Sequence, residues 1–339
     1  MDHRGRALNN KLINSVCNKY GIDVSTFDKF IDSSHGEKDS RYIYIINQSY
    51  AIKIYSTSMI TEEFLININS LVDRYRSIGL WCPKLIKNDN DKFLTLVSYE
   101  NRTYRCYVEE YAPYQFSDDK DIYSLKRKMI GHLGRLATLY SDVGLVDHYS
   151  MWSVIDLNLM DEEVDEKQEN LNNLVKVLHD NGYIKLTKLL DDKNDKVREI
   201  IKKDYKKLPR CVYQGDLNPT NLLIDEYNNF VGLIDFNMFG TEVNINCFIN
   251  ESMHYMLEED FNLSVDEILA KANSIQKELL DIIFEEYTIN DLERDLFQYY
   301  KFITNISFYP NVQLWIYLIK NHLNEEKVIE LIEQLIIEQ

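Results

Sequence analysis

The stretch "YQGDLNPTNLLID", Tyr213–Asp225, sets an acid in a turn between two strand-like runs. Asp216 follows the apolar run "RCVY", and Asn221 stands five residues later, directly before "LLI". The turn "DEYNN" and the run "FVGLI" then lead to Asp235. Two strands joined by a tight turn would bring Asp235 back beside Asn221. One loop therefore carries an acid and an amide, and a neighbouring strand end carries a second acid.

This set of side chains indicates a site for a hard cation. Mg²⁺ takes oxygen ligands, usually one or two protein carboxylates together with substrate phosphates and water. Asn221 and Asp235 are therefore the predicted metal ligands, which leaves Asp216 to face an incoming hydroxyl. The Asp216–Asn221 spacing and an acid at a strand end each occur by chance in many proteins. Their order and spacing together are much more specific for this kind of site.

Composition sets the class of protein. The chain has 339 residues, 45% of them hydrophobic and 27% charged, which is typical of a soluble globular protein with two domains or one two-lobed domain. The formal net charge of −17 argues against nucleic acid as a partner and fits a cationic substrate. No uninterrupted apolar run of membrane length and no apolar signal core occur, so we expect a cytoplasmic protein that binds no membrane.

The five cysteines are scattered and form no C-x-x-C pair. This spacing favours reduced thiols in the core over a disulfide framework or a zinc site.

The pattern of apolar residues changes at about residue 110 and divides the chain into two parts. Residues 1–110 read as a small sheet with an internal helix, and residues 111–339 read as mostly helical. The signals are helical spacing at 7–20, 60–78 and 125–144 and through much of 163–206, a hairpin at 41–55, and strand-like runs at 92–98, 103–111, 210–216 and 229–236. Helices resume near residue 247. The acidic run "MDEEVDEKQEN" (160–170) is interpreted as a solvated helix face.

At this point a resemblance appears. "QGDLNPTN…GLIDFN" resembles the catalytic core of the aminoglycoside phosphotransferase family, a branch of the protein-kinase-like fold that includes choline, homoserine and methylthioribose kinases and spore-coat kinase-like proteins. The likeness is strongest over about residues 211–240. It implies an α+β, two-lobed fold, with a small antiparallel β N-lobe (1–110) that binds nucleotide and a larger α-helical C-lobe (111–339).

The resemblance also implies roles for particular residues. Asp216 would orient the acceptor hydroxyl and take its proton, while Asn221 and Asp235 would hold Mg²⁺ against the phosphates of ATP or GTP. Lys53, in "YAIKIY", would contact those phosphates. A helical glutamate would pair with Lys53, and both Glu62 and Glu63 qualify, with Glu62 preferred.

Two further parts of a nucleotide site follow from the same resemblance. Gly36, in "SHGEKDS", occupies the place of the loop that covers the nucleotide. The segment "YVEEYAPY" resembles the hinge between the lobes, where backbone groups near Glu109, Glu110 and Tyr111 would meet the base.

The sequence departs from the family pattern at three points. Gln214 replaces the histidine that normally braces the loop before Gly-Asp, and glutamine can also donate and accept hydrogen bonds. Asn237 replaces the glycine of Asp-Phe-Gly, and asparagine tolerates left-handed backbone. The phosphate-covering loop has the single glycine Gly36.

Several functions remain open on these residues. The first is Mg²⁺-dependent phosphotransfer to a hydroxyl of a small molecule, an aminoglycoside or another cationic amino-alcohol or amino-sugar, by a monomer or homodimer. The acceptor could instead be a metabolite such as homoserine or choline. A non-catalytic, spore-coat-like protein on the same fold is a further alternative. A protein-substrate kinase is disfavoured, because no activation segment ending in A-P-E follows Asp235.

Overall fold

The structure is a computed structural model that describes residues 3–34, 39–99, 101–116 and 122–337. The chain forms two compact units, one of Met1–Asp118 with Asn218–Asn237 and the other of Asp119–Leu217 with Met238–Gln339. The predicted division at residue 110 therefore differs from the observed units by the segment Asn218–Asn237. This segment belongs to the first unit because its strand at residues 222–224 pairs with residues 115–116, while its second strand, at residues 230–233, pairs with 222–224. As a result, Asp216 lies in the second unit and Asn221 and Asp235 lie in the first.

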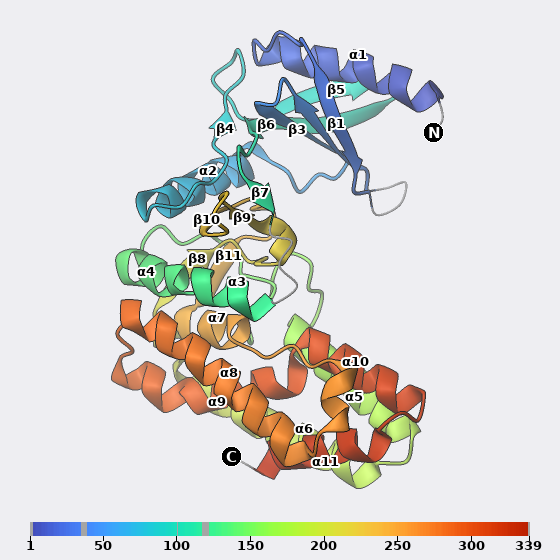
Figure 1. The fold of residues 1–339 in the computed structure, drawn as a ribbon, viewed down its shortest axis with the longest axis vertical. Coiled ribbons are helices and arrows are strands. Elements are labelled where there is room, and N and C mark those ends of the chain that lie inside the picture. Colours follow the sequence, from blue (N-terminus) through green and yellow to red (C-terminus); the bar gives the residue numbers. More distant parts are fainter. Residues whose placement is uncertain (1–2, 35–38, 100, 117–121, 338–339) are drawn as a thin grey trace. The chain divides into compact units, whose positions relative to one another are not determined.

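The first unit contains an antiparallel sheet (Figure 1). The strands are paired in the order β1-β2-β3-β6-β4, and β5 pairs with β6. The bounds are β1 Phe27–Asp32, β2 Arg41–Ile46, β3 Tyr50–Tyr55, β4 Leu85–Ile86, β5 Thr95–Tyr99 and β6 Arg102–Glu110. The predicted hairpin is β2–β3, and its turn holds Asn47 and Gln48 at positive φ. A second small sheet has the order β10-β9-β7, from β7 Gln115–Phe116, β9 Leu222–Ile224 and β10 Phe230–Leu233.

The two faces of the main sheet carry different residues because side chains alternate along a strand. One face packs against α1 (His3–Lys19) in a core that includes Ile13, Val16, Ile52, Ile54, Cys106 and Val108. The alternate positions on β3 and β6 are Lys53, Tyr55, Tyr107 and Glu109, so the opposite face holds the polar groups. Helix α2 (Glu62–Ser77) lies within the predicted helical segment 60–78. It begins at the N-cap Thr61 and buries Leu65, Ile68, Leu71, Val72 and Tyr75.

The second unit is mainly helical, with one two-stranded sheet. The strands β8 (Arg210–Tyr213) and β11 (Gly240–Val243) pair antiparallel. The helices are α3 Ile122–Met129, α4 Gly131–Tyr140, α5 Glu166–Asp180, α6 Ile184–Asp204, α7 Asn244–Glu251, α8 Val265–Glu286, α9 Asp291–Ser307, α10 Tyr309–Lys320 and α11 Glu325–Ile337. Short 3₁₀ turns are η1 Tyr205–Lys207, η2 Pro219–Asn221 in the first unit, and η3 Glu258–Asn262. The segment predicted as one helix over 125–144 is thus two helices, α3 and α4.

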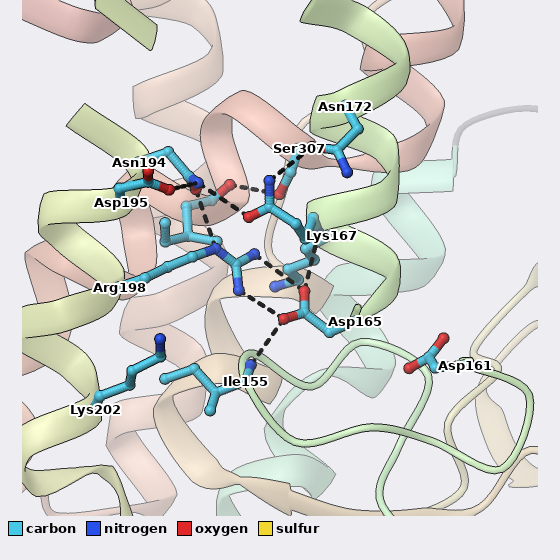
Figure 2. A network of polar contacts seen from close by, with 12 residues as sticks. Ile155, Asp161, Asp165, Lys167, Asn172, Asn194, Asp195, Arg198, Lys202 and Ser307 are labelled. Atoms are coloured by element: carbon cyan, nitrogen blue, oxygen red, sulfur yellow. Dashed lines mark hydrogen bonds and ion pairs between the residues drawn. The ribbon is translucent and has the colours of Figure 1, made fainter. Parts of the chain in front are cut away.

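The interpretation of the acidic run as a solvated face is wrong for several of its residues. Asp165 caps α5 and is buried, and its carboxylate accepts two hydrogen bonds from Arg198 of α6 at 2.6 and 3.0 Å. Figure 2 shows these groups facing each other, with the Ile155 amide donating to the same carboxylate. Burial would raise the pKa of Asp165, but the Arg198 guanidinium outweighs it and lowers that pKa. Lys167 and Asn170 are buried too, because both face the neighbouring helices.

Three further features concern the cysteines, the length of the helices and the apolar face of α11. Among the described residues, all five cysteines are buried and none forms a disulfide. Across the described chain, no helix combines the length and apolar character needed to cross a bilayer. Helix α11 buries Val328, Leu331, Ile332 and Leu335 along one face, at the spacing of an amphipathic helix.

Two glycines of α4 give a matched test of the packing in the second unit. A Cβ on Gly134 would lie 2.3 Å from the Ile283 backbone oxygen, whereas a Cβ on Gly131 would contact Ile282 Cγ2 at 3.4 Å. Alanine favours a helix over glycine by about 1 kcal/mol at an interior position. We therefore expect Gly134→Ala to lower the free energy of unfolding by about 2–3 kcal/mol through overpacking. Gly131→Ala should leave it unchanged or slightly raised, as measured by urea denaturation. Equal stabilities of the two variants would contradict the close approach of α4 to α8.

Candidate functional site

The turn that carries Asp216 is held in place by groups of the second unit. Gln214 is fully buried, and its Oε1 accepts a hydrogen bond from the Asp216 amide at 2.7 Å. Gly215 has φ +83°, and a Cβ there would lie 2.2 Å from the Met238 backbone oxygen, so glycine is required on both counts. The Trp152 indole donates to the Gly215 carbonyl at 2.9 Å. The backbone of this turn is therefore formed before any substrate binds.

A buried cation and a second acid lie near Asp216. Lys126 of α3 donates to the backbone oxygen of Glu251 at 2.7 Å and lies 4.5 Å from the centroid of the Tyr255 ring. Burial lowers the pKa of Lys126 to about 8, although the charge of Glu251 opposes this shift. Burial raises the pKa of Glu251, Lys126 offsets part of the rise, and the charge of Asp216 adds to it. Asp216 and Glu251 thus place two carboxyl groups in one region of the second unit, with the Lys126 ammonium beside Glu251.

Asn221 and the backbone leading into Asp235 are neighbours in the first unit. The strands β9 and β10 pair so that Leu222 faces Leu233. The Ile234 amide donates to the backbone oxygen of Asn221 at 3.0 Å. Asn221 is buried, while Asp235 is partly exposed and has φ +57°. The strand pairing thus carries an amide and a carboxylate to the same end of the small sheet.

Lys53 is the buried cation of the first unit's sheet. Its Nζ lies 3.0 Å from Glu109 Oε1 and 3.5 Å from Asp235 Oδ1, with its side chain 6% exposed. Burial alone would lower the pKa of Lys53, but the two carboxylates outweigh it and hold that pKa well above its ordinary value. Burial raises the pKa of Glu109, and Lys53 opposes that rise. The ammonium group therefore stays charged at neutral pH.

Two tyrosines and an asparagine surround this ion pair. The rings of Tyr55 and Tyr107 stack with centroids 5.9 Å apart, and Lys53 Nζ lies 5.8 Å from the Tyr107 centroid. Asn237 accepts from the Tyr107 hydroxyl and donates to the Tyr55 hydroxyl, both at 3.1 Å, and its amide also donates to Asp235. The left-handed residue of the turn is Asp235, so the expectation that Asn237 would supply that backbone conformation is corrected. The contribution of Asn237 is the set of side-chain hydrogen bonds to Tyr55, Tyr107 and Asp235.

The predicted pairing of Lys53 with a helical glutamate does not occur in the structure. Both carboxylate oxygens of Glu62 accept backbone hydrogen bonds, from Phe93 at 3.0 Å and Leu94 at 2.8 Å, and Glu63 is exposed. Instead, Lys53 pairs with Glu109, which lies on β6. In the register of β3 with β6, Lys53 faces Tyr107 and Ala51 faces Glu109, which makes Glu109 a diagonal neighbour on the same face. Long side chains reach across such a diagonal.

The backbone near Glu109–Tyr111 is already partly engaged. The Glu110 amide donates to the backbone oxygen of Lys84 at 3.0 Å, and the Tyr111 amide donates to the backbone oxygen of Ser49 at 2.8 Å. These two N–H groups are therefore occupied by the protein, and contact of the base with this segment stays a prediction for its other backbone groups. The Glu110 carboxylate pairs with Arg76 at 2.7 Å. Gly36, predicted for the phosphate-covering loop, lies outside the described residues.

The sequence reasoning missed the roles of Glu109, Tyr107 and Trp152. The strand alternation of β6 was a usable signal for the first two, because it places residues 107 and 109 on one face. The contact of Trp152 with the Asp216 turn had no local signal. Across the described chain, no group of three or more His, Cys, Asp or Glu side chains is arranged to hold a metal ion.

Comparison with known proteins identifies the fold. No family model and no curated protein sequence matches the chain. Among solved structures, one similar structure is an amicoumacin kinase, hAmiN, in complex with AMP-PNP, Ca²⁺ and Ami, at 12% identity and TM-score 0.55 over 100% of this chain and 97% of that one. Another is a spectinomycin phosphotransferase, APH(9)-Ia, with ADP and spectinomycin, at 14% identity and TM-score 0.53 over 96% and 98%.

The chain therefore has the two-lobed, protein-kinase-like α+β fold of these small-molecule kinases, and the predicted fold class is confirmed. The likeness spans nearly the full length of both chains.

The pairing of Lys53 with Glu109 can be tested by a double-mutant cycle. Glu109→Met leaves Lys53 buried with Asp235 as its remaining carboxylate, and we expect a loss of about 3 kcal/mol in the free energy of unfolding. The double variant Lys53→Met/Glu109→Met should recover most of that loss, because it buries no uncompensated charge. Removing the exposed partner of Lys84 by Asp73→Ala is the control, with a change of less than about 1 kcal/mol. Strictly additive effects of the two single substitutions would show that the pair is not coupled.

Proposed function

We propose that the protein is a Mg²⁺-dependent phosphotransferase that moves the γ-phosphoryl group of ATP or GTP to a hydroxyl of a small molecule. The observation that carries the proposal is the Lys53 ammonium, held buried against Glu109 and Asp235, with Asn221 directly before β9, the strand that pairs with β10. A buried cation with one partly exposed carboxylate beside it suits a ligand that brings its own phosphates and metal ion.

The first unit supplies the nucleotide side of this proposal. Lys53 binds phosphate oxygens, and Glu109 and Asp235 hold its Nζ in place. Asn221 and Asp235 fit a magnesium ion, because a neutral amide and one carboxylate are the donors such an ion takes besides phosphate and water. When bound, the ion neutralises the charge on the β- and γ-phosphates. Glu110 and Tyr111 belong to the segment assigned to the base, and Glu62 supports the sheet through Phe93 and Leu94.

The second unit supplies the acceptor side. Asp216 accepts a hydrogen bond from the acceptor hydroxyl and takes its proton as the oxygen attacks the γ-phosphorus. A new P–O bond forms to the acceptor while the bond to the β-phosphate oxygen breaks, and the nucleoside diphosphate leaves. Gln214 and Trp152 keep the Asp216 turn in a fixed geometry. Phosphoryl transfer depends mostly on such positioning and on charge stabilisation.

A cationic acceptor is the class we propose. The carboxyl groups of Asp216 and Glu251 lie near each other in the second unit, and the chain carries a net charge of −17. Ammonium groups of an aminoglycoside or an amino-alcohol would be attracted to this region. The names of the two similar structures, an amicoumacin kinase and a spectinomycin phosphotransferase, support this class. We place the enzyme in the cytoplasm, as a monomer or homodimer, where the buried cysteines remain reduced.

Substitution of Asp216 separates catalysis from nucleotide binding. We expect Asp216→Asn to lower the turnover number by about 10²–10⁴-fold with little change in Mg-nucleotide affinity, because the residue handles the acceptor proton. Lys53→Met should instead weaken nucleotide binding, as measured by calorimetry. Asp192→Asn, at an exposed position of α6, is the control and should behave as wild type. Absence of Mg-nucleotide binding by the wild-type protein would exclude the proposed reaction.

The acceptor class can be tested by coupled nucleotide turnover with a panel of compounds. We expect spectinomycin, kanamycin or another polyamine sugar, or a small amino-alcohol, to stimulate turnover. Glu251→Gln should raise KM for the stimulating amine by about tenfold with kcat less affected, as expected for loss of one charge contact. Removal of Mg²⁺ with EDTA should abolish turnover. Stimulation by uncharged polyols alone would contradict a cationic acceptor.

A further inference from the structure

A cavity of about 470 Å³ lies between α8 and α9 of the second unit, with Leu335 of α11 at its side. Figure 1 shows these two helices side by side. The cavity volume falls within the range of about 300–1,000 Å³ that is common for small-molecule sites. The residues that line it include none of those assigned above to phosphoryl transfer. The cavity is therefore a candidate for a second ligand site.

Two contacts cross the cavity from α8 to α9. Lys301 of α9 donates to the side-chain oxygen of Asn273 of α8 at 3.1 Å, and the rings of Phe284 and Phe297 lie with their centroids 6.1 Å apart. All four residues line the cavity. Asn273 and Phe284 are eleven positions apart on α8, which is about 16 Å at 1.5 Å per residue. The lining therefore follows the helices for about that length.

The end of the cavity near Asn273 is polar. Gln276 of α8 lines it one turn further along the helix and is 3% exposed. In the described part of the chain its amide donates to the Met253 thioether at 3.2 Å, and no other hydrogen bond of this side chain is present. A thioether is a weak acceptor, so this carboxamide keeps its oxygen and one N–H for an occupant. Asn305 of α9 adds a third carboxamide, since a smaller hollow shares Asn273, Gln276 and Asn305 with the cavity.

The end of the cavity near Phe284 is apolar. Leu280 is buried and lies one turn before Phe284 on α8. Phe284 and Phe297 extend this apolar surface, with their ring planes inclined by 58°. The exposed residues Asp281 and Gln298 also belong to the lining. Phenyl rings pack well against another ring. The cavity thus offers hydrogen-bonding groups at one end and an apolar surface at the other.

The charged residues of the lining are already paired. Lys277 pairs with Asp281 at 2.6 Å. Lys301 has a further interaction partner besides its hydrogen bond to Asn273. A charged ligand would have to disrupt one of these pairings or leave its own charge uncompensated, and both are unfavourable. The lining therefore favours an uncharged ligand.

We propose that the α8–α9 cavity binds an uncharged glycoside, in which a hydroxylated ring is joined to an apolar ring. Gln276 and Asn305 would hydrogen-bond the hydroxyl groups, because carboxamides both donate and accept, as hydroxyl groups do. The apolar ring would pack against Leu280, Phe284 and Phe297. The proposal concerns binding and does not depend on the phosphotransferase activity.

Three probes separate the contributions of the two ends and of charge. Phenyl β-glucoside has a hydroxylated ring, an apolar ring and no charge, whereas glucose lacks the apolar ring and phenyl β-glucuronide adds one negative charge. Their affinities for the full chain can be measured by ligand-observed NMR titration. We expect phenyl glucoside to bind best, and glucose about tenfold more weakly because it lacks the apolar contacts. Phenyl glucuronide should bind more weakly than the glucoside, because both lysines of the lining are already paired.

Two substitutions act on the two ends of the cavity separately. Gln276→Leu should weaken the binding of both phenyl glucoside and glucose about tenfold, the equivalent of one hydrogen bond. Phe297→Leu should weaken phenyl glucoside about fivefold and leave glucose unchanged, because it removes a contact between rings. A general loss of structure would not separate the two ligands in this way. Gln313→Leu, at an exposed glutamine of α10, is the matched control and should bind both as wild type.

Stability separates a binding role of Gln276 from a structural one. Because Gln276→Leu removes a buried amide with one weak partner, its melting temperature without ligand should be equal to or higher than that of wild type. If that variant fails to fold, Asn305→Leu provides the same test of affinity. Failure of phenyl glucoside to bind at millimolar concentrations would overturn the proposal. Tighter binding of the glucuronide than of the glucoside, or unchanged glucoside binding in both variants, would also overturn it.

Discussion

The buried ammonium of Lys53 sets the strongest constraint on the first unit. An uncompensated charge in the protein interior costs several kcal/mol, so the sheet must bring carboxylates to it. Glu109 does this from the neighbouring strand, and Asp235 does it from the turn after β10. The positive φ of Asp235 and the hydrogen bonds of Asn237 to Tyr55 and Tyr107 belong to the same arrangement. The need to neutralise Lys53 therefore explains contacts made by three chain segments, namely β3, β6 and the turn after β10.

The motif around Asp216 is shared between two separately stabilised parts of the chain. Asp216 depends on Gln214, Gly215 and Trp152 of the second unit, whereas Asn221 depends on the β9–β10 pairing of the first. The five residues from Asp216 to Asn221 limit how far apart the two can be, because each residue spans at most about 3.3–3.6 Å. The proposed base and the proposed metal ligands are therefore each held locally by a different set of contacts.

Local signals in the sequence explain which features could be predicted. The hairpin of β2 and β3, the amphipathic α2 and α11, and the order of Asp216, Asn221 and Asp235 all follow from spacing within a short window. The pairing of Lys53 with Glu109 does not follow from such spacing, because it depends on the register between β3 and β6. Likewise, Glu62 is occupied by amides thirty residues away, and Asp165 by an arginine on the next helix. Such pairings are set by tertiary packing. Strand alternation shows on which face Glu109 lies, but not that it pairs with Lys53.

The origin of the glutamate that holds Lys53 bears on regulation. Because Glu109 lies on a strand hydrogen-bonded to β3, rotation of α2 would not separate the ion pair. An outward movement of that helix would therefore leave Lys53 and Glu109 paired. The proposed phosphate site thus depends on the pairing of β3 with β6 and on the turn after β10, and not on the position of α2.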